Sequence, residues 1–448
     1  MLGGMDYLLH RAAGYAAAYR RSLNDRRVAG PMETNGFAVP LQKEPRQPVE
    51  VLDELAAAAE NGLVATAGPR FFGFVIGGSL PSATAAEILT AGWDQCAFNG
   101  VLAPAAAAAE QAAGGWLKEL LGIPESASVG FVTGAQAANT VGLAAARHHV
   151  LAEIGWDVER KGLLGAPPVR VLASVQRHAT VDRSLRLLGF GSDLIEEVPA
   201  DANGAIDVSE LRRVLESGQG PLIVCLQAGN VNTGACDDLR TACRMVHDHG
   251  GWAHVDGAFG LWAAASPATR HLVDGVELAD SWGCDGHKWL NVPYDSGFAF
   301  CARPQVHVAA MSYTASYLVG SGASPGIADY TAESSRRARG FAVWAALREL
   351  GRDGVTELVE RCCRLAQRFA FQLRTAGIGV VNDVVLNQVL VDLGDDVVEV
   401  VQRDGTCWLG GTTWQGRRMM RISVSNYSTT EADVDRSVAA ILRAANLS

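Results

Sequence analysis

The 448-residue sequence has no apolar run that approaches the ~20 residues required for a membrane-spanning helix. Its first residues include Asp6, His10 and Arg11, whereas a secretory signal peptide needs an unbroken apolar stretch. The nine cysteines are scattered, odd in number and free of C-x-x-C pairs, which argues against a disulfide framework and a cysteine zinc site. These absences predict a soluble, cytoplasmic protein whose cysteines are mostly small buried hydrophobic residues.

Charged residues are also sparse, at 19% of the chain, while hydrophobic residues make up 48%. A chain of this composition can bury a large core and is not disordered. The formal net charge is −10, which disfavours a protein that binds nucleic-acid backbones or anionic membranes. We therefore expect a small-molecule substrate, with no nucleic-acid and no membrane partner.

Motifs for nucleotide binding are missing as well. The sequence has neither a G-x-x-x-x-G-K-[ST] loop nor a G-x-G-x-x-G turn after a predicted strand, so NTP hydrolysis and NAD binding lack support. The segment Gly322-Ala-Ser-Pro-Gly326 matches the G-x-S-x-G pattern of hydrolases. However, no predicted strand precedes it, and Pro325 disfavours the sharp turn into a helix that this nucleophile requires. We interpret the segment as a loop.

The middle of the chain alternates short β-type runs with helical segments. The predicted strands cover 169–174, 222–227, 252–255 and 297–301, and the predicted helices between them cover 179–188 and 237–249. This alternation predicts an α/β fold with a mostly parallel sheet that is flanked by helices. In such sheets ligands bind beyond the carboxyl ends of the strands.

The two ends of the chain have different patterns. Residues 5–27 predict an amphipathic helix, which cannot shield its apolar face alone and so favours contact with another part of the protein or with a second subunit. Near the other end, a long helix is predicted over 340–376, followed by short strands and a terminal helix from Glu431. This tail predicts a smaller α+β domain.

Two residues at the predicted edge of the sheet suggest a particular chemistry. Asp256 ends a predicted strand, and Lys288 follows in the segment Asp285-Gly-His-Lys-Trp289. An enzyme that uses pyridoxal 5'-phosphate (PLP) needs a lysine amine to form a Schiff base with the cofactor aldehyde. It also needs a carboxylate that keeps the pyridine nitrogen protonated. Taken singly, an acid at a strand end and a surface lysine are ordinary structural residues.

Other segments add to this hypothesis. Gly130-Phe-Val-Thr-Gly-Ala-Gln-Ala-Ala-Asn139 leads into a predicted helix, and small residues at a helix start let backbone N–H groups approach a phosphate. His178 follows another predicted strand and could stack on an aromatic ring. A plain helix entry and a structural histidine are the alternatives for these two features.

A metal site is a competing interpretation of the same region. His247, His249, His254 and Asp256 are close in sequence and are all potential ligands. Gly250 and Gly251 separate a predicted helix end from a strand there, so these side chains need not converge. We therefore expect no metal site.

Together, the motifs resemble those of the group II PLP-dependent amino acid decarboxylases, the family of the aromatic amino acid, glutamate and histidine decarboxylases. The resemblance covers nearly the whole chain. Its anchors are Pro69-Arg-Phe-Phe-Gly-Phe74, Gly77-Gly-Ser-Leu-Pro81, Phe131–Asn139, His178, Gly229-Asn-Val-Asn-Thr-Gly-Ala235, His254-Val-Asp256, His287-Lys-Trp289 and Ser335-Arg-Arg-Ala-Arg339.

The resemblance implies specific roles for residues around the cofactor. Lys288 would hold PLP, Asp256 would pair with the pyridinium nitrogen, and His178 would stack over the ring. Ala135 and Gln136 match positions that grip the phosphate.

It implies further contacts as well. His287 would be an additional phosphate partner, and Asn230 matches a polar residue beside the ring. Phe72 and Leu80 fall where the family lines a substrate pocket at a dimer interface.

The resemblance also implies a fold of type I, like that of aspartate aminotransferase. Its parts would be an N-terminal helical arm over residues 1–60, a large PLP-binding domain over 61–345 and a small C-terminal domain over 346–448. The implied assembly is a homodimer. The implied reaction is the decarboxylation of an L-amino acid to the amine and CO2, and Phe72, Phe74 and Leu80 favour an aromatic or apolar substrate.

The sequence departs from the family at the expected proton donor, a tyrosine on a loop before Arg336-Arg337. Counting back from these arginines without gaps places Ile327 at the tyrosine position and Tyr330 at a tryptophan position, and Tyr313 and Tyr317 are also in the loop. Tyr330 does not occupy the tyrosine position in this count. It is a candidate for the acid that protonates the product because it is a tyrosine of the same loop. Displacement of this acid leaves an aldehyde-forming reaction open.

Arg421 introduces a further alternative. It lies on a predicted C-terminal strand, where related folds hold an arginine for the substrate carboxylate, although a structural ion pair explains it equally well. A carboxylate clamp would favour an aminotransferase or an aldolase over a decarboxylase. A PLP-fold subunit that has lost catalysis is the alternative from another functional class.

Overall fold

The computed structural model describes residues 2–30, 34–313 and 325–446. The helices are α1 (Leu2–Ser22), α2 (Pro48–Glu60), α3 (Pro81–Trp93), α4 (Pro104–Leu121), α5 (Ala135–Ala152), α6 (Val158–Lys161), α7 (Ala179–Leu187), α8 (Val208–Glu216), α9 (Leu239–Asp248), α10 (Pro304–Met311), α11 (Gly340–Thr375), α12 (Asp395–Asp404) and α13 (Glu431–Ala444). The strands are β1 (Ser128–Val132), β2 (Arg170–Ser174), β3 (Ile195–Val198), β4 (Leu222–Gln227), β5 (Trp252–Asp256), β6 (Ser281–Asp285), β7 (Gly297–Cys301), β8 (Gln388–Val391), β9 (Gly410–Trp414) and β10 (Arg417–Ser423).

The chain divides into two compact units. The larger unit comprises residues 79–366 and 382–388, and the smaller one comprises residues 1–78, 367–381 and 389–448. This division differs from the three-part organisation expected from the sequence, because the N-terminal segment is tied to the C-terminal residues. Val28 N–H donates to Gly405 O over 2.8 Å, and Phe72 N–H donates to Trp408 O over 2.7 Å.

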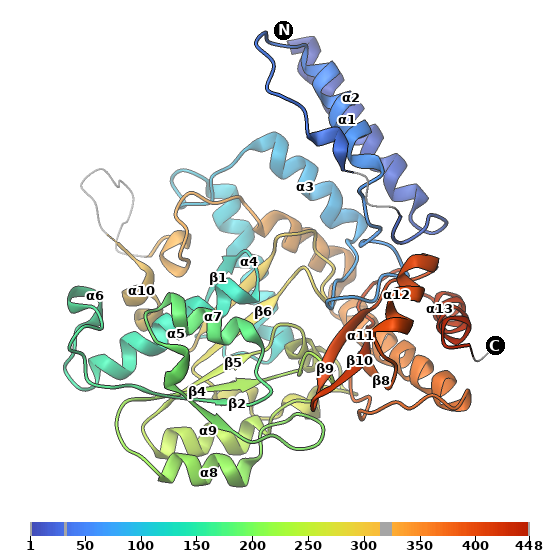
Figure 1. Cartoon of the computed structure of the whole chain (residues 1–448). Coiled ribbons are helices and arrows are strands. Elements are labelled where there is room, and N and C mark those ends of the chain that lie inside the picture. Colours follow the sequence, from blue (N-terminus) through green and yellow to red (C-terminus); the bar gives the residue numbers. More distant parts are fainter. Residues whose placement is uncertain (1, 31–33, 314–324, 447–448) are drawn as a thin grey trace. The chain divides into compact units, whose positions relative to one another are not determined.

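The larger unit is built on a seven-stranded sheet with the order β1-β7-β6-β5-β4-β2-β3 (Figure 1). In this sheet β7 runs antiparallel to both of its neighbours, and β3, β2, β4, β5 and β6 pair in parallel. Helices α5 and α7 pack together on the sheet, and α8 and α9 pack against β3, β4 and β5. The expected mostly parallel sheet flanked by helices is confirmed.

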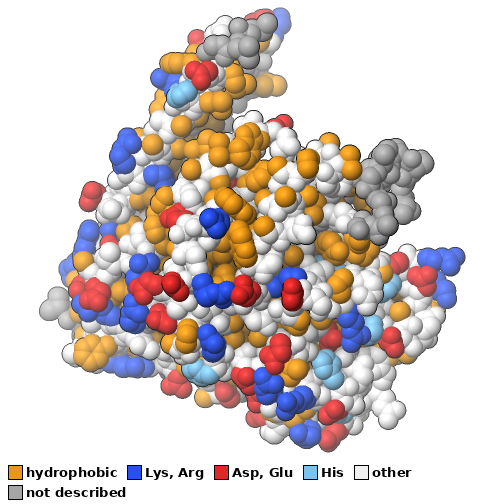
Figure 2. Space-filling model, turned by 180° about the vertical axis from the view of Figure 1, so that it is seen from behind, with side chains coloured by type: hydrophobic (Ala, Val, Ile, Leu, Met, Phe, Trp, Pro, Cys, Tyr) orange, Lys and Arg blue, Asp and Glu red, His pale blue; other side chains and the backbone are white. Residues whose placement is uncertain are grey.

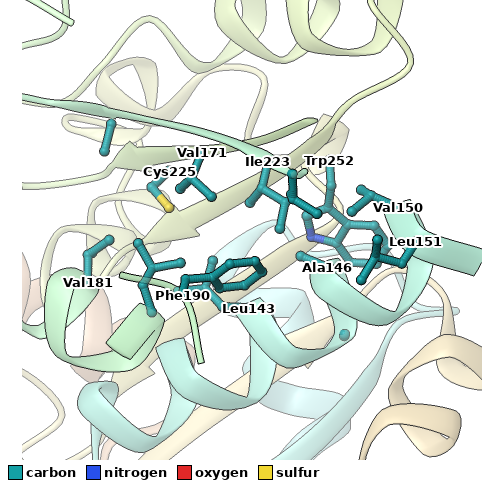
Figure 3. Packing of buried hydrophobic residues seen from close by; sticks show 14 of the residues in the cluster. Leu143, Ala146, Val150, Leu151, Val171, Val181, Phe190, Ile223, Cys225 and Trp252 are labelled. Carbon is teal, nitrogen blue, oxygen red and sulfur yellow. The ribbon is translucent and has the colours of Figure 1, made fainter. Parts of the chain in front are cut away.

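A large hydrophobic cluster joins α5 to the sheet (Figure 3). Leu143 and Val150 from the helix meet Val171 of β2, Ile223 of β4 and Trp252 of β5, all of them buried. Burial of each large apolar side chain contributes roughly 1.5–3 kcal/mol, so this cluster fixes the helix firmly on the strands. The start of α5 is thereby held beside the strand ends.

Several predicted elements match the structure within a few residues, and others were missed. Strand β7 spans the predicted residues, and the long helix α11 begins at the predicted Gly340 but is interrupted at Gly351. The φ angle of +61° at Gly351 lies in the left-handed region that favours glycine. The sequence pattern did not predict β3, with its two glutamates, or β6, which lacks a β-branched residue.

The smaller unit contains a three-stranded sheet with the order β8-β10-β9, together with helices that include α1, α2, α12 and α13. Helices α1 and α2 contact each other, and the Arg11 guanidinium donates to both carboxylate oxygens of Asp53. Across the described residues of both units, no helix is long and apolar enough to cross a lipid bilayer.

Candidate active site

Three neighbouring strands of the larger unit end in polar side chains at the same edge of the sheet. Gln227, Asp256 and Asp285 are the last residues of β4, β5 and β6. Gln227 lies opposite Asp256 in the parallel register, and Asp256 lies opposite Gly283. Parallel pairing therefore brings these three side chains to one place, as expected for the ligand site of such a sheet.

A cavity of about 270 Å³ opens at this edge. Its lining residues are Thr133, Gly134, Ala135, Gln136, His178, Thr180, Gln227, Gly229, Val231, Asp256, Ala258, Phe259, Asp285, His287 and Lys288. Six of the residues singled out from the sequence are among them, namely Ala135, Gln136, His178, Asp256, His287 and Lys288. The structure thus brings together residues that are up to 153 positions apart in the chain.

Lys288 lies in the loop after β6 and contacts the last residue of that strand. Its Nζ is 2.9 Å from Oδ2 of Asp285, and the Asp285 side chain is only 3% exposed. The same carboxylate accepts a hydrogen bond from Ala135 N–H over 2.5 Å and has Nε2 of His287 at 3.3 Å from its Oδ1. The buried Asp285 carboxylate therefore contacts Lys288, the adjacent His287 imidazole and the start of α5.

The neighbouring His287 is held as a neutral imidazole. Its Nδ1 accepts a hydrogen bond from Ser296 N–H over 3.2 Å, so the ring carries its proton on Nε2, toward Asp285. Burial lowers the pKa of His287, with the Asp285 carboxylate acting in the opposite direction. The ring also stacks on Tyr294 with a centroid distance of 4.2 Å. This arrangement fixes the plane of the imidazole at the cavity wall.

The start of α5 forms another wall. Gly134 precedes the helix, and a Cβ at this position would lie 2.9 Å from Cε1 of His287 and 3.1 Å from Oδ1 of Asp285. Only glycine allows the backbone to come this close to both side chains. The side-chain amide of Gln136 donates to Ser184 Oγ over 2.8 Å, so that amide is engaged with α7. The backbone N–H groups of the first turn, with the helix dipole, suit an anion.

His178 approaches the cavity from the start of α7. It is the N-cap residue of that helix, and its Nδ1 accepts from Thr180 N–H over 3.3 Å and lies 2.8 Å from Thr180 Oγ1. Because Nδ1 accepts, the neutral ring carries its proton on Nε2. The sequence predicted that this residue would reach the site, and the capping contacts explain how its ring is fixed.

Asp256 is 5% exposed and lies at the cavity end of β5, where its Oδ1 accepts from Ala258 N–H over 3.2 Å. Two residues earlier on the strand, His254 is fully buried between Ser281 and Asn139. Burial lowers the pKa of His254 to about 3, so it is neutral in the folded protein. Both ring nitrogens of His254 are therefore engaged in a hydrogen-bonded network with Ser281 and Asn139.

The described residues contain no group of three or more histidine, cysteine, aspartate or glutamate side chains that could hold a metal ion. Within that part of the chain, His247 pairs with Asp280 over 3.0 Å, and His249 contacts Met245 O over 2.8 Å. The four residues considered as metal ligands therefore point to separate partners.

The remaining residues selected from the sequence have other surroundings. Asn230 donates to Gln176 O over 3.1 Å and accepts from the N–H groups of Asn232 and Thr233, so it organises its own loop. Its neighbours Gly229 and Val231 line the cavity instead.

Two residues expected to contact the substrate are buried in their own units. Phe72 lies in the smaller unit, where its ring meets Phe369 edge to face at 5.0 Å. Leu80 lies in the larger unit, and its N–H donates to Asn291 O over 2.9 Å, three residues after Lys288. Arg421 lies on β10 of the smaller unit, and burial lowers its pKa to about 10.

Tyr330 lies at the end of a short 3-10 helix over Ile327–Tyr330, which contacts β1. Its ring packs edge-on against His307 at 5.2 Å, and it is not among the described residues that line the cavity. Tyr313 contacts Ser334 through its hydroxyl. Tyr317 and most of the Gly322–Gly326 segment lie outside the described residues.

Asp285, Phe259 and Val231 line the cavity but were not selected from the sequence. Asp285 ends a strand just as Asp256 does, so the criterion that identified Asp256 would have identified it once β6 was recognised. Val231 lies inside the Gly229–Ala235 motif, but the motif gave no role to this residue, and Phe259 follows Asp256 as an ordinary apolar residue. Only the folded arrangement places both side chains in the cavity wall.

The donor set of the cavity suits the expected cofactor. An amine, a carboxylate at a strand end, a fixed imidazole and an anion-binding helix start are the groups that hold PLP. The close approach of Gly134 to His287 and Asp285 leaves the first turn of α5 at the cavity wall.

Comparison with known proteins agrees with this geometry. A family model described as the pyridoxal-dependent decarboxylase conserved domain matches residues 32–390. The chain is 29% identical to an aromatic-L-amino-acid decarboxylase of Bacillus atrophaeus, over 72% of this chain and 66% of the relative. It is 27% identical to a 4-hydroxyphenylacetaldehyde synthase of Rhodiola rosea, over 71% of this chain and 66% of the relative. The chain therefore spans about two thirds of the length of these relatives.

A solved structure of Oryza sativa TDC with PLP and tryptamine superposes with a TM-score of 0.91. The sequence identity is 23%, and the match covers all of this chain and 98% of the other. At this level of identity the likeness shows the fold, and it confirms the fold class expected from the sequence.

The buried neutral His254 predicts a loss of stability at low pH. An unfolded histidine has a pKa of about 6.5, so below that pH the unfolded state binds a proton that the folded state, with its pKa of about 3, does not bind. This single group should therefore cost about 2 kcal/mol of unfolding free energy between pH 7 and pH 5. Replacement of His254 by Gln should reduce the pH dependence of urea unfolding by that amount. Equal pH dependence in the two proteins would contradict the assignment of a buried neutral imidazole.

Proposed function

Because the chain belongs to the pyridoxal-dependent decarboxylase family, we propose that it converts an L-amino acid with an aromatic or other apolar side chain to the amine and CO2. The membership confirms the family resemblance of the motifs, the PLP cofactor and the class of enzyme, a PLP-dependent decarboxylase. The aromatic-L-amino-acid decarboxylase among the relatives supports the proposed substrate class.

The observation that carries this proposal is the presence of an amine, a carboxylate and an imidazole in one cavity. Lys288, Asp256 and His178 all line the cavity at the strand ends. When bound, PLP supplies an aldehyde that condenses with amines and a conjugated ring that accepts the electron pair left by departing CO2. Lys288 would hold the cofactor through its amine, and Asp256 would keep the ring nitrogen protonated.

Other residues of the cavity orient and protect these groups. The start of α5, with Ala135 and Gln136, would hold the phosphate, and His287 is fixed beside it by Ser296. Phe259 is 2% exposed and lies with Val231 in the cavity wall, where the two side chains exclude water. A dry site strengthens the electrostatic interactions of Asp256 and Lys288.

The product needs a proton at the carbon that loses CO2. His178 carries a proton on Nε2 and lines the cavity, whereas Tyr330 packs against His307. We therefore assign the proton to His178 Nε2 and retain Tyr330 as the alternative donor.

The lining favours an uncharged substrate side chain. Among the described residues that line the cavity, Lys288 is the only lysine or arginine, and it is paired with Asp285. A substrate with a side-chain carboxylate would find no second cation there. Val231 and Phe259 instead provide apolar surface.

An aldehyde synthase is the second candidate function. The similarity to the Rhodiola rosea 4-hydroxyphenylacetaldehyde synthase favours it. Ile327 favours it too, since a count back from Arg336-Arg337 without gaps places this residue at the tyrosine position of the family. Aminotransferase, aldolase and non-catalytic alternatives are distinguished by the same product experiment.

We further propose that the protein is a homodimer that acts in the cytoplasm. Helix α3 of the larger unit exposes about half of each of Ile88, Leu89 and Trp93, and Val101 just beyond it is even more exposed. Figure 2 shows broad areas of hydrophobic side chains on the face that it draws. Apolar surface of this kind is typical of a subunit interface. The nine free cysteines favour a reducing compartment.

Incubation of the PLP-loaded protein with a pool of amino acids should release CO2 and an equal amount of one aromatic or apolar amine. Mass spectrometry of products, with the Lys288→Ala variant as control, is the measurement. The variant should lose turnover, the visible absorbance of the bound cofactor and its trapping by borohydride. CO2 with aldehyde and ammonia would favour the aldehyde synthase, and a keto acid without CO2 would favour an aminotransferase. Unchanged trapping in Lys288→Ala would refute the role of the lysine.

The proton donor can be identified by two single substitutions. His178→Phe keeps an aromatic ring but removes the N–H group, so we expect a rate loss of roughly 10²–10⁴-fold and more abortive product, aldehyde or keto acid, per amine. Tyr330→Phe, measured in the same way, should have the smaller effect. If the Tyr330 variant instead shows the larger rate loss and the larger change in product ratio, then Tyr330 is the donor.

The dimer proposal predicts a particle of twice the 47.3 kDa chain mass in light scattering. Replacing Ile88 and Leu89 together by Glu should place charges in the interface and shift the particle toward the monomer. Leu164→Glu is a matched control, because Leu164 is 95% exposed and outside α3. A monomeric wild-type protein, or an unchanged dimer in the double variant, would count against α3 as the interface.

A further inference from the structure

Asp285 is a buried acid in the cavity to which the proposed reaction gives no role. Its side chain is bound from three sides, by Lys288 Nζ at 2.9 Å, by Ala135 N–H at 2.5 Å and by His287 Nε2 at 3.3 Å. Its backbone is fixed as well, because its N–H donates to Ala258 O and its carbonyl accepts from Trp262 Nε1. A carboxylate held this firmly cannot move away at little cost.

The charged side chains that line the cavity give it a net negative charge, which disfavours the binding of an anion. The nitrogen atoms that accept hydrogen bonds make His178 and His287 neutral imidazoles. Asp256 and Asp285 then contribute two negative charges, against one positive charge from Lys288. The lining therefore carries a formal net charge of −1, although it must accept a cofactor that carries a phosphate.

Asp285 also occupies the donor that a phosphate needs. The first N–H group of α5 belongs to Ala135, and the carboxylate accepts its hydrogen bond. Gly134 permits this contact, since a Cβ there would lie 3.1 Å from Oδ1 of Asp285. The carboxylate thus already neutralises both the helix start and the lysine.

We propose that Asp285 is the resident counter-ion of Lys288 and of the start of α5, and that its negative charge weakens the binding of the cofactor phosphate. The carboxylate satisfies these two positive groups in the cofactor-free protein and competes with the phosphate for them. Because of this competition, the Asp285 carboxylate makes the cofactor easier to release than a neutral side chain at this position would. This inference rests on the assignment of the cavity as the cofactor site.

Asp285→Asn tests the charge without removing the hydrogen bond, because an amide oxygen can still accept from Ala135 N–H. The dissociation constants of the cofactor-free variant for inorganic phosphate and for PLP should each fall roughly tenfold relative to the wild type. The constant for pyridoxal, which lacks the phosphate, should change much less. Quenching of the fluorescence of Trp262 and Trp289, which lie next to Asp285 and Lys288, reports binding without any turnover.

Asp256→Asn is the matched control, since it removes a carboxylate from the same cavity but not from the start of α5. A general charge effect would strengthen phosphate binding equally in both variants and would overturn the proposal. Unchanged or weaker phosphate binding in a folded Asp285→Asn protein would also overturn it. Asp285→Ser, a second neutral variant, must change phosphate affinity in the same direction and serves if the asparagine variant does not fold.

The outcomes separate this inference from the proposed function. Borohydride trapping that persists in Lys288→Ala would refute the cofactor site itself. Trapping that depends on Lys288, combined with a phosphate affinity that does not respond to Asp285, would refute only the role of Asp285.

Discussion

The contact between Asp285 and Lys288 is the interaction on which the rest of the site depends. It joins the end of β6 to the following loop, and the same carboxylate reaches the first N–H group of α5. Asp285 is almost completely buried, so its charge requires these partners. Three parts of the chain that are distant in sequence are positioned by one side chain, and any anionic ligand of the cavity must replace or tolerate it.

The parallel pairing of the strands positions the polar side chains at the edge of the sheet. Parallel pairing places the ends of β4, β5 and β6 side by side, so that Gln227, Asp256 and Asp285 share an edge. The hydrophobic cluster between the later turns of α5 and the strands fixes this helix on the sheet (Figure 3). Buried pairs extend this rigidity, because Arg336 binds both oxygens of Glu110 and also donates to Phe131 O on β1. The strand that leads into the Gly134-Ala135 turn is thereby held in place.

The sequence predicts those parts of the fold and site whose chemistry is visible in local patterns. Lys288, Asp256, His178 and the Gly134-Ala135 turn follow from residue type and position after predicted strands, and the structure brings them into one cavity. Asp285 was missed because Ser-Trp-Gly-Cys-Asp has little of the composition of a strand. Without the strand, the acid at its end has no special position.

Residues whose roles depend on side-chain direction are harder to predict. Asn230 has the residue type of a cofactor ligand, but its amide forms hydrogen bonds with the backbone of its own loop and of Gln176. Tyr330 has a suitable hydroxyl, but its ring packs on His307. Motif spacing gives the position of a residue along the chain and not the direction of its side chain, which is set by packing from distant elements.

The residues proposed to hold the cofactor differ from the residue proposed to protonate the product. Lys288 and Asp256 belong to the larger unit and to one cavity, and in the proposed function they would hold the cofactor and keep its ring able to accept electrons. The relatives include an aromatic-L-amino-acid decarboxylase and a 4-hydroxyphenylacetaldehyde synthase, so both products are candidates for this chain. The distinction must then arise after CO2 departs, at the step where a proton is delivered to carbon. The donor that we propose for this step is His178, whose Nδ1 caps α7 and whose ring therefore carries its proton on Nε2. With His178 as the proposed donor, control of the product would depend on how firmly the Thr180 contacts hold this ring, and less on the residues proposed to bind the cofactor.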